Sequence, residues 1–284
     1  MFTQEEWPTI VPQRRENFSI GPEQSISTVA ALSWSSPGLA KYRRCLLAVL
    51  TSNLVLSFYE SAGLQGKWIR ISTVGRALQS YFSQSISNVG LRLRKSRIRS
   101  FAWCPPIKFR VSVDDNSPDP VSRWGLHILV VANDDSDLIF LLVKRRRESN
   151  YEIEVLSVIS LHEPLNTGGN HPMIMNGSLF AAAVRSRFLL SHISCGPWIS
   201  QPPPSAKSLH SFVAVLGIIH GTKLKTIELN ASTQPASLEE PDSTGMVNVN
   251  AVERALPVHD CSLHFTGPLQ WIFDVRPGEV GAEI

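Results

Sequence analysis

The sequence predicts an all-β fold assembled from repeated four-stranded sheets. Apolar and polar residues alternate with a period of two through the well-patterned stretches, as in half-buried strands, and long stripes with the 3.6-residue period of a helix are scarce. A similar order of strands then recurs along the chain, and an aromatic residue near a proline closes the first strand of a unit. Recurrence of this kind is typical of propellers and solenoids.

The first unit is expected at about residues 28–75. TVAALSWSSP (28–37) alternates like a strand and ends in Trp34 and Pro37. Three more strands are expected in order: CLLAVLTSN (45–53), LVLSFYE (54–60) and WIRISTV (68–74). The turn between the second and third strands contains Asn53, and Asn tolerates the left-handed backbone that tight hairpins need.

Further units are expected at about residues 97–161 and 188–230, with the start of another blade at 260–284. The second unit has strands in RIRSFAWCPP (97–106), HILVVANDD (127–135), DLIFLLVK (137–144) and YEIEVLSVISL (151–161). The third has strands in FLLSHISCGPW (188–198), SFVAVLGIIH (211–220) and KLKTIELN (223–230). SLHFTGPLQW (262–271) repeats the pattern of a first strand.

This order of strands is that of a WD40-like β-propeller, with Tyr59-Glu60 where a regular WD40 repeat has Trp-Asp. Each blade of such a fold buries both faces only against its neighbours, and closed propellers have about four to eight blades. We therefore expect a flexible lead-in at 1–27 and an incomplete propeller over 28–284, as in a fragment or a truncated gene model of a longer protein. A closed ring with two unrecognised blades is the alternative.

Composition and charge narrow the class of protein. No run of residues approaches the eighteen or so apolar residues of a membrane span, and the charged start MFTQEEWP is unlike a signal peptide, so we expect a soluble intracellular protein. Four cysteines without a C-x-x-C pair argue against a disulfide framework or a zinc ribbon. Residues 1–110 hold 15 Lys and Arg against 5 Asp and Glu. This surplus indicates an acidic or polyanionic partner for the first half.

The first unit also carries a family resemblance. ALSWSSPGLA (31–40) followed by RRCLLAVLTSNLVLSFYE (43–60) closely resembles the N-terminal propeller of the transcription factor IIIC delta-type subunit, in its fungal form. That family has a W-S-P-x-G-L-A turn followed by C-x-L-A-V-L-T-S-N. Glu6-Trp7-Pro8 also resembles the lead-in of the family, and the strong match covers about residues 16–60.

The resemblance implies a scaffold subunit for transcription initiation by RNA polymerase III on transfer RNA and 5S RNA genes. It implies a nuclear protein whose partners are other transcription factor IIIC subunits and RNA polymerase III initiation factors, with DNA met mainly through the complex and with no cofactor. Two alternatives stay open: the histone acetyltransferase activity credited to the family, and a generic WD40-like adaptor unrelated to transcription.

The clearest charged feature is LRLRKSRIRS (91–100), whose cations form the candidate binding patch: Arg92, Arg94, Lys95, Arg97 and Arg99. We expect this segment to be an extended strand, on which alternate residues share a face. Arg97 and Arg99 would then line one side and contact phosphates or an acidic partner. The alternative is a solvated strand edge whose charge discourages aggregation.

Three shorter motifs have simpler interpretations. KRRR (144–147) resembles a nuclear-localisation cluster, but it also lies where a strand would leave the sheet, and we favour a loop. NDDSD (133–137) lacks the Gly and the distant Glu of a calcium loop, so a hairpin turn is expected. HDCSLH (259–264) offers His259, Cys261 and His264 but no second ligand pair for structural zinc. No metal site is expected.

Motifs for catalysis are absent from the sequence. It contains no G-x-S-x-G, H-E-x-x-H, G-x-x-x-x-G-K-[ST] or G-x-G-x-x-G. We therefore expect a chain that binds partners and has no catalytic residues of its own.

Overall fold

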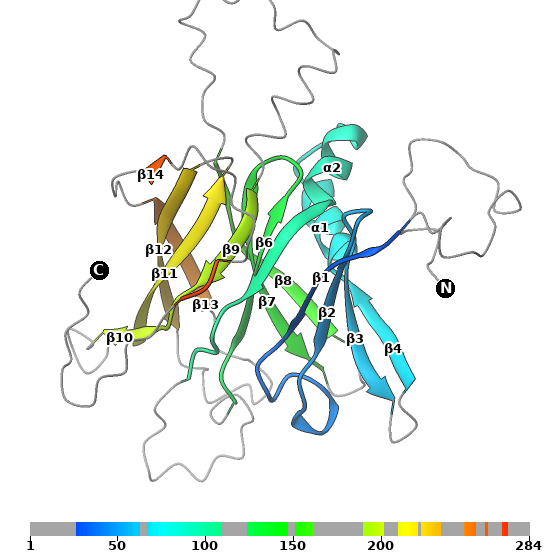
Figure 1. Cartoon of the computed structure of the whole chain (residues 1–284), viewed down its shortest axis with the longest axis horizontal. Helices are drawn as coiled ribbons and strands as arrows, with labels where there is room; N and C mark the ends of the chain where they lie inside the picture. Colours follow the sequence, from blue (N-terminus) through cyan, green and yellow to red (C-terminus); the bar gives the residue numbers. More distant parts are fainter. Residues whose placement is uncertain are drawn as a thin grey trace, which may run out of the picture.

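The computed structural model describes residues 27–62, 67–108, 124–146, 151–161, 190–201, 210–220, 223–233, 247–253, 259–260 and 269–271. The strands of these residues form three antiparallel sheets that lie side by side (Figure 1). The all-β fold expected from the sequence is therefore confirmed. No helix in the described ranges is both long and apolar enough to cross a membrane.

The first and second sheets each contain four strands in chain order. The first sheet consists of β1 (Val29–Trp34), β2 (Leu47–Thr51), β3 (Leu56–Ala62) and β4 (Lys67–Thr73). The second sheet consists of β5 (Ile98–Trp103), β6 (His127–Asn133), β7 (Asp137–Arg145) and β8 (Tyr151–Ser160). These eight strands lie in the stretches that the alternation predicts. A short 3-10 helix, η4 (Lys41–Arg43), lies between β1 and β2.

The third sheet is built around two long strands, β11 (His210–His220) and β12 (Lys223–Thr233). β9 (Leu190–Cys195) and β10 (Ile199–Gln201) pair end to end with one edge of β11. β13 (Val247–Glu253) and β14 (His259–Asp260) pair in the same way with β12. Alternation in the sequence did not reveal β13, which follows a Ser- and Pro-rich stretch.

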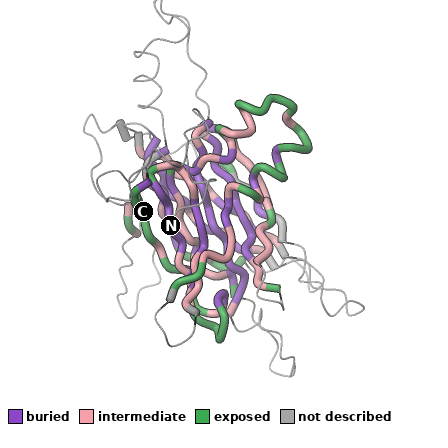
Figure 2. The backbone as a smooth tube through the Cα atoms, turned by 90° about the vertical axis from the view of Figure 1, so that its right-hand side faces the viewer, coloured by how far each residue is buried: buried purple, intermediate pink, exposed green. Residues whose placement is uncertain are grey.

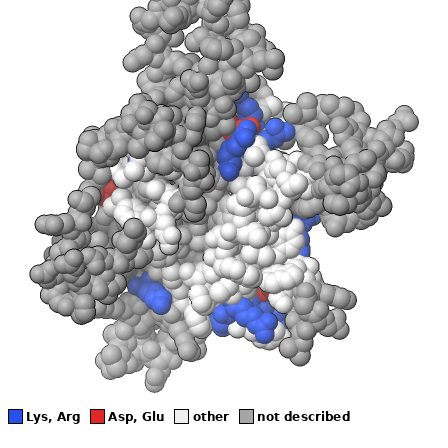
Figure 3. Space-filling view, in the orientation of Figure 1, with Lys and Arg blue, Asp and Glu red and all other residues white. Residues whose placement is uncertain are grey.

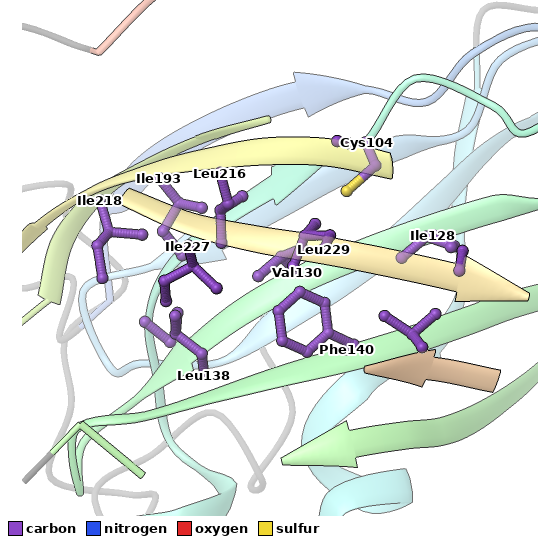
Figure 4. Packing of buried hydrophobic residues seen from close by; sticks show 14 of the residues in the cluster. Cys104, Ile128, Val130, Leu138, Phe140, Ile193, Leu216, Ile218, Ile227 and Leu229 are labelled. Atoms are coloured by element: carbon purple, nitrogen blue, oxygen red, sulfur yellow. The ribbon is translucent and has the colours of Figure 1, made fainter. Parts of the chain in front are cut away.

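The second sheet packs between the other two. Alternate side chains of β6 and β7 point to opposite faces, because the side-chain period of a strand is two. One set joins the core of the first sheet: Leu129, Val131, Ile139, Leu141 and Val143. The other set, which includes Val130 and Phe140, packs against Leu216, Ile227 and Leu229 of the third sheet (Figure 4). Figure 2 shows the buried residues concentrated along strands in the middle of the molecule. This is the packing of successive propeller blades.

Two α-helices follow β4, and the second lies where the sequence predicts an extended strand. α1 (Val74–Ser83) buries Val74, Leu78 and Phe82, which recur every four residues along one helix face. α2 (Val89–Ser96) begins at Asn88, whose side-chain Oδ1 accepts a hydrogen bond from the backbone N–H of Leu91 at 3.1 Å. The expectation of an extended strand over 91–96 is therefore wrong.

Candidate interaction surface

The five cations of the candidate patch lie on three different elements. Arg92, Arg94 and Lys95 belong to α2, Arg97 follows the helix in extended conformation, and Arg99 lies on β5. Leu, Arg and Lys are good helix formers, and an Asn cap precedes them, which explains why the segment starts as a helix. A strand over 91–96 therefore does not form, and of the five cations Arg97 and Arg99 lie on extended backbone.

An acidic hairpin turn lies beside these cations. Asn133 Oδ1 accepts hydrogen bonds from the backbone N–H groups of Asp135 and Asp137 at 2.9 and 2.8 Å. Its side-chain amide donates to Asp137 Oδ2 at 2.9 Å. These bonds close the turn between β6 and β7, and Ser136 takes the positive φ of 56° that such a turn needs. The hairpin expected for NDDSD is confirmed.

Three of the five cations form ion pairs with this turn. Arg94 contacts Asp135 at 2.9 Å, and Arg99 contacts Asp134 at 2.5 Å. Lys95 contacts Asp137 at 2.6 Å and Asp135 at 3.1 Å, and the side chain of Asp137 is almost fully buried. Removal of Lys95 would leave Asp137 as a buried charge without that partner, which proteins rarely tolerate. These three cations therefore stabilise the fold.

The pKa of Lys95 reports the same environment. Burial lowers this pKa, but the hydrogen bonds to Asp137 and Asp135 raise it by more, so the pKa of the ammonium lies above its usual value. Lys95 therefore stays charged throughout the physiological range. Its charge is mainly neutralised by these two carboxylates and adds little to the charge of the surface.

Arg92 and Arg97 are the two members of the patch that remain available. Both side chains are partly exposed, and neither forms an ion pair or a hydrogen bond within the described residues. In Figure 3 the upper group of blue atoms touches red atoms, where Figure 1 places α2 and the β6–β7 turn. The patch is thus smaller than the sequence predicts, and its binding role remains a hypothesis for these two residues.

A second basic group lies at the other end of the first sheet, and sequence reasoning missed it. Lys41, Arg43 and Arg44 are exposed on the connection between β1 and β2. Figure 3 shows a lower group of blue atoms where Figure 1 places this connection, and most of the surface between the two blue groups is uncharged. The signal in the sequence was KYRRC (41–45), with three cations in four residues.

The KRRR cluster, the cysteines and the HDCSLH motif are the remaining candidates for chemistry. Lys144 and Arg146 pair with Glu154 and Glu152 on β8, at 3.1 and 2.7 Å. The thiol of Cys104 contacts that of Cys195, and this contact together with burial raises the pKa of Cys104, so that the thiol stays protonated at neutral pH. The described residues contain no group of three His, Cys, Asp or Glu placed to hold a metal ion. The side chains of His259, Cys261 and His264 lie outside the described residues.

Comparisons with known proteins agree with this architecture. The family model for the β-propeller domain of transcription factor IIIC subunit delta matches residues 1–280. A search of curated proteins returned no match. The family model spans nearly the whole chain, and the three stacked antiparallel sheets have the packing of propeller blades. The chain therefore belongs to the transcription factor IIIC delta family, of which it carries the β-propeller domain.

Proposed function

We propose that this chain is a scaffold subunit of a transcription factor IIIC complex of the fungal type, and that it acts in the initiation of RNA polymerase III transcription in the nucleus. The observation that carries the proposal is the family match over residues 1–280. Its partners are other subunits of the complex and RNA polymerase III initiation factors. DNA is met mainly through the assembled complex.

The surface supports binding by electrostatic attraction. Arg92 and Arg97 present charge that no described residue neutralises. Charges of this kind at the rim of an interface raise the rate of association and make it dependent on salt. We propose that these two residues contact an acidic segment of a neighbouring subunit or the DNA backbone. Arg94, Lys95 and Arg99 hold the β6–β7 turn in place and contribute to binding only by positioning the helix.

The test is co-purification of the other subunits with the full chain in cell extract. The double variant Arg92→Glu with Arg97→Glu should retain about fivefold less of the other subunits, with a weaker dependence on salt. The matched control is Lys108→Glu with Arg146→Glu, which changes the net charge equally at two exposed sites away from α2. Equal retention by the two double variants would exclude a role for Arg92 and Arg97. Failure of the unmodified chain to retain any subunit would refute the scaffold function.

A further inference from the structure

The first sheet carries an apolar face that points away from the second sheet. Strand register places Leu32 opposite Val49, and Trp34 opposite Leu47, on this outer face. Ala48 and Leu50 lie on the other face, in the core shared with the second sheet. Trp68 of β4 contacts Trp34, with ring centroids 5.6 Å apart.

Exposure distinguishes this face from the interior of the molecule. Leu32 is 61% exposed, Trp34 53% and Trp68 48%. Large apolar side chains gathered on one exposed face are typical of a surface that another segment covers. The described residues supply no such segment for these three side chains, so their cover has to come from elsewhere.

Tryptophans at equivalent places in the other units show what a first-strand Trp contacts. Trp103, at the end of β5, stacks on Phe58 of the first sheet, with centroids 5.7 Å apart. Trp198 follows β9, and its indole N–H donates to the carbonyl of Pro105 beside the second sheet at 2.8 Å. Trp271 donates to the carbonyl of Ser194 in the third sheet at 3.0 Å. Each Trp thus contacts the part of the chain that precedes its own unit.

By the same rule Trp34 would contact a segment that precedes the first sheet, and residues 1–26 lie directly before it. This segment ends directly before Ser27, at the start of the first sheet. Nineteen residues lie between Trp7 and Ser27, and an extended chain covers about 3.3 Å per residue. β1 has only six residues, so the segment is long enough to reach Trp34 at the far end of the strand.

The surroundings of Trp34 fit an acidic segment with an aromatic side chain. A cavity of about 470 Å³ is lined by Trp34, Trp68, Tyr42, Lys41, Arg44 and Glu60. The carboxylate of Glu60 already accepts hydrogen bonds from the backbone N–H of Lys41 and from the Tyr151 hydroxyl. The side chains of Arg43 and Arg44 form no ion pair within the described residues. The cavity therefore combines aromatic walls with a positively charged rim.

The complementary sequence lies near the beginning of the chain. Residues 1–26 contain four Glu and two Arg, a net charge of −2, and Glu5 and Glu6 directly precede Trp7. We propose that residues 1–26 bind the outer face of the first sheet, with Trp7 in the cavity beside Trp34 and Trp68. This binding would bring Glu5 and Glu6 next to the cations of the β1–β2 connection. The segment would then cover the first sheet as the other units cover one another.

The test is a disulfide trap in the full chain, because native Cys45 lines the cavity. Gln4→Cys places a thiol close to Trp7, and mild oxidation followed by peptide mapping measures its rate of bond formation with Cys45. A tethered tail has a high effective concentration even when it does not bind. The informative comparison is therefore between chains of the same tether length. The rate of disulfide formation in Gln4→Cys is compared with the rate after adding Trp7→Ala, or after adding Glu5→Lys with Glu6→Lys. We expect about a tenfold slower reaction in each.

Two further variants make the result decisive. Adding Lys41→Glu and Arg44→Glu to the Glu5→Lys, Glu6→Lys chain should restore much of the lost rate, because both charge signs are exchanged. A rate that is unchanged by Trp7→Ala would overturn the proposal, since the tail would then meet Cys45 only by chance. Disulfides that form between two chains, and not within one chain, would also overturn the proposal. They would indicate that a second copy of the chain covers this face.

Discussion

The first and second sheets have the same strand order but very different burial. All seven residues of β6 and the first seven of β7 are buried, whereas five of the six residues of β1 are exposed. The difference follows from position, because within the described residues the second sheet has a neighbour on each face and the first sheet has one. Packing against neighbouring blades therefore contributes more to the stability of a propeller blade than the blade's own sequence pattern does.

Truncation of a core side chain tests this contrast with the largest expected loss of stability. Phe140 is fully buried between the second and third sheets (Figure 4). Phe140→Ala should lower the free energy of unfolding by about 3–5 kcal/mol, because the lost contacts leave a cavity. The measurement is urea denaturation followed by circular dichroism.

The matched control is Leu32→Ala on the outer face of the first sheet. Leu32 is 61% exposed, so in a Trp7→Ala background, which weakens the proposed binding of residues 1–26, this truncation should change the free energy of unfolding by about 0.5 kcal/mol or less. Similar losses at Phe140 and Leu32 would contradict the contrast between the two sheets. A large loss at Leu32 alone would show that another segment buries the outer face, as proposed for residues 1–26.

A second test uses pH, because burial in the second sheet affects a histidine. Burial lowers the pKa of His127, at the start of β6, to about 4 from the usual 6.5. The folded state then binds this proton less readily than the unfolded state. The contribution of His127 to the free energy of unfolding is therefore fully present above pH 6.5 and is lost as the pH falls towards 4. From pH 7 to 5 we expect this one group to cost about 2 kcal/mol of unfolding free energy.

The check on the histidine is its isosteric replacement. His127→Gln should remove most of this pH dependence while leaving the stability at pH 7 within about 1–2 kcal/mol of the parent. Urea titrations at pH 7 and pH 5 measure both quantities. If the variant loses as much stability on acidification as the parent, then other groups carry the effect and His127 is not the buried titrating residue.

The strands were predictable because their signal is local. Short runs of apolar and β-branched residues bounded by Asn- or Asp-containing turns locate the eight strands of the first two sheets within a few residues. The helix α1 was also visible in principle, because Val74, Leu78 and Phe82 recur every four residues. This stripe spans only the 10 residues of α1, and a pattern that short is weak evidence for a helix.

The candidate site was less predictable because its contacts are distant in sequence. Lys95 and Asp137 are 42 residues apart, and Arg99 and Asp134 are 35 apart. Only the register between β5 and β6 brings them together, and register is not readable from one segment alone. The basic segment and the acidic turn were each noticed, but their mutual neutralisation required the fold. Trp34 is 53% exposed, although Trp103 at the same place in the second unit stacks on Phe58.

The smallest expected effect concerns backbone strain at the cavity of the first sheet. Tyr42 has a φ of 56° and its side chain is 74% exposed. A left-handed backbone costs a residue with a Cβ about 1–2 kcal/mol, and glycine avoids this cost while losing more chain entropy on folding. Tyr42→Gly should therefore raise the free energy of unfolding by up to about 1 kcal/mol.

The control is Tyr81→Gly, which should change the free energy of unfolding in the opposite direction. Tyr81 is an exposed tyrosine within α1, where glycine lowers stability by about 1 kcal/mol. Urea denaturation of the two variants separates backbone strain from the loss of an aromatic side chain, which they share. A loss of stability in both would mean that the Tyr42 side chain, with the Lys41 ammonium 5.1 Å from its ring centroid, contributes more than its strained backbone costs. That result would support the cavity as a binding site. If the exposed Tyr42 side chain stabilises the fold, it already contacts the surface on which Trp7 is proposed to bind.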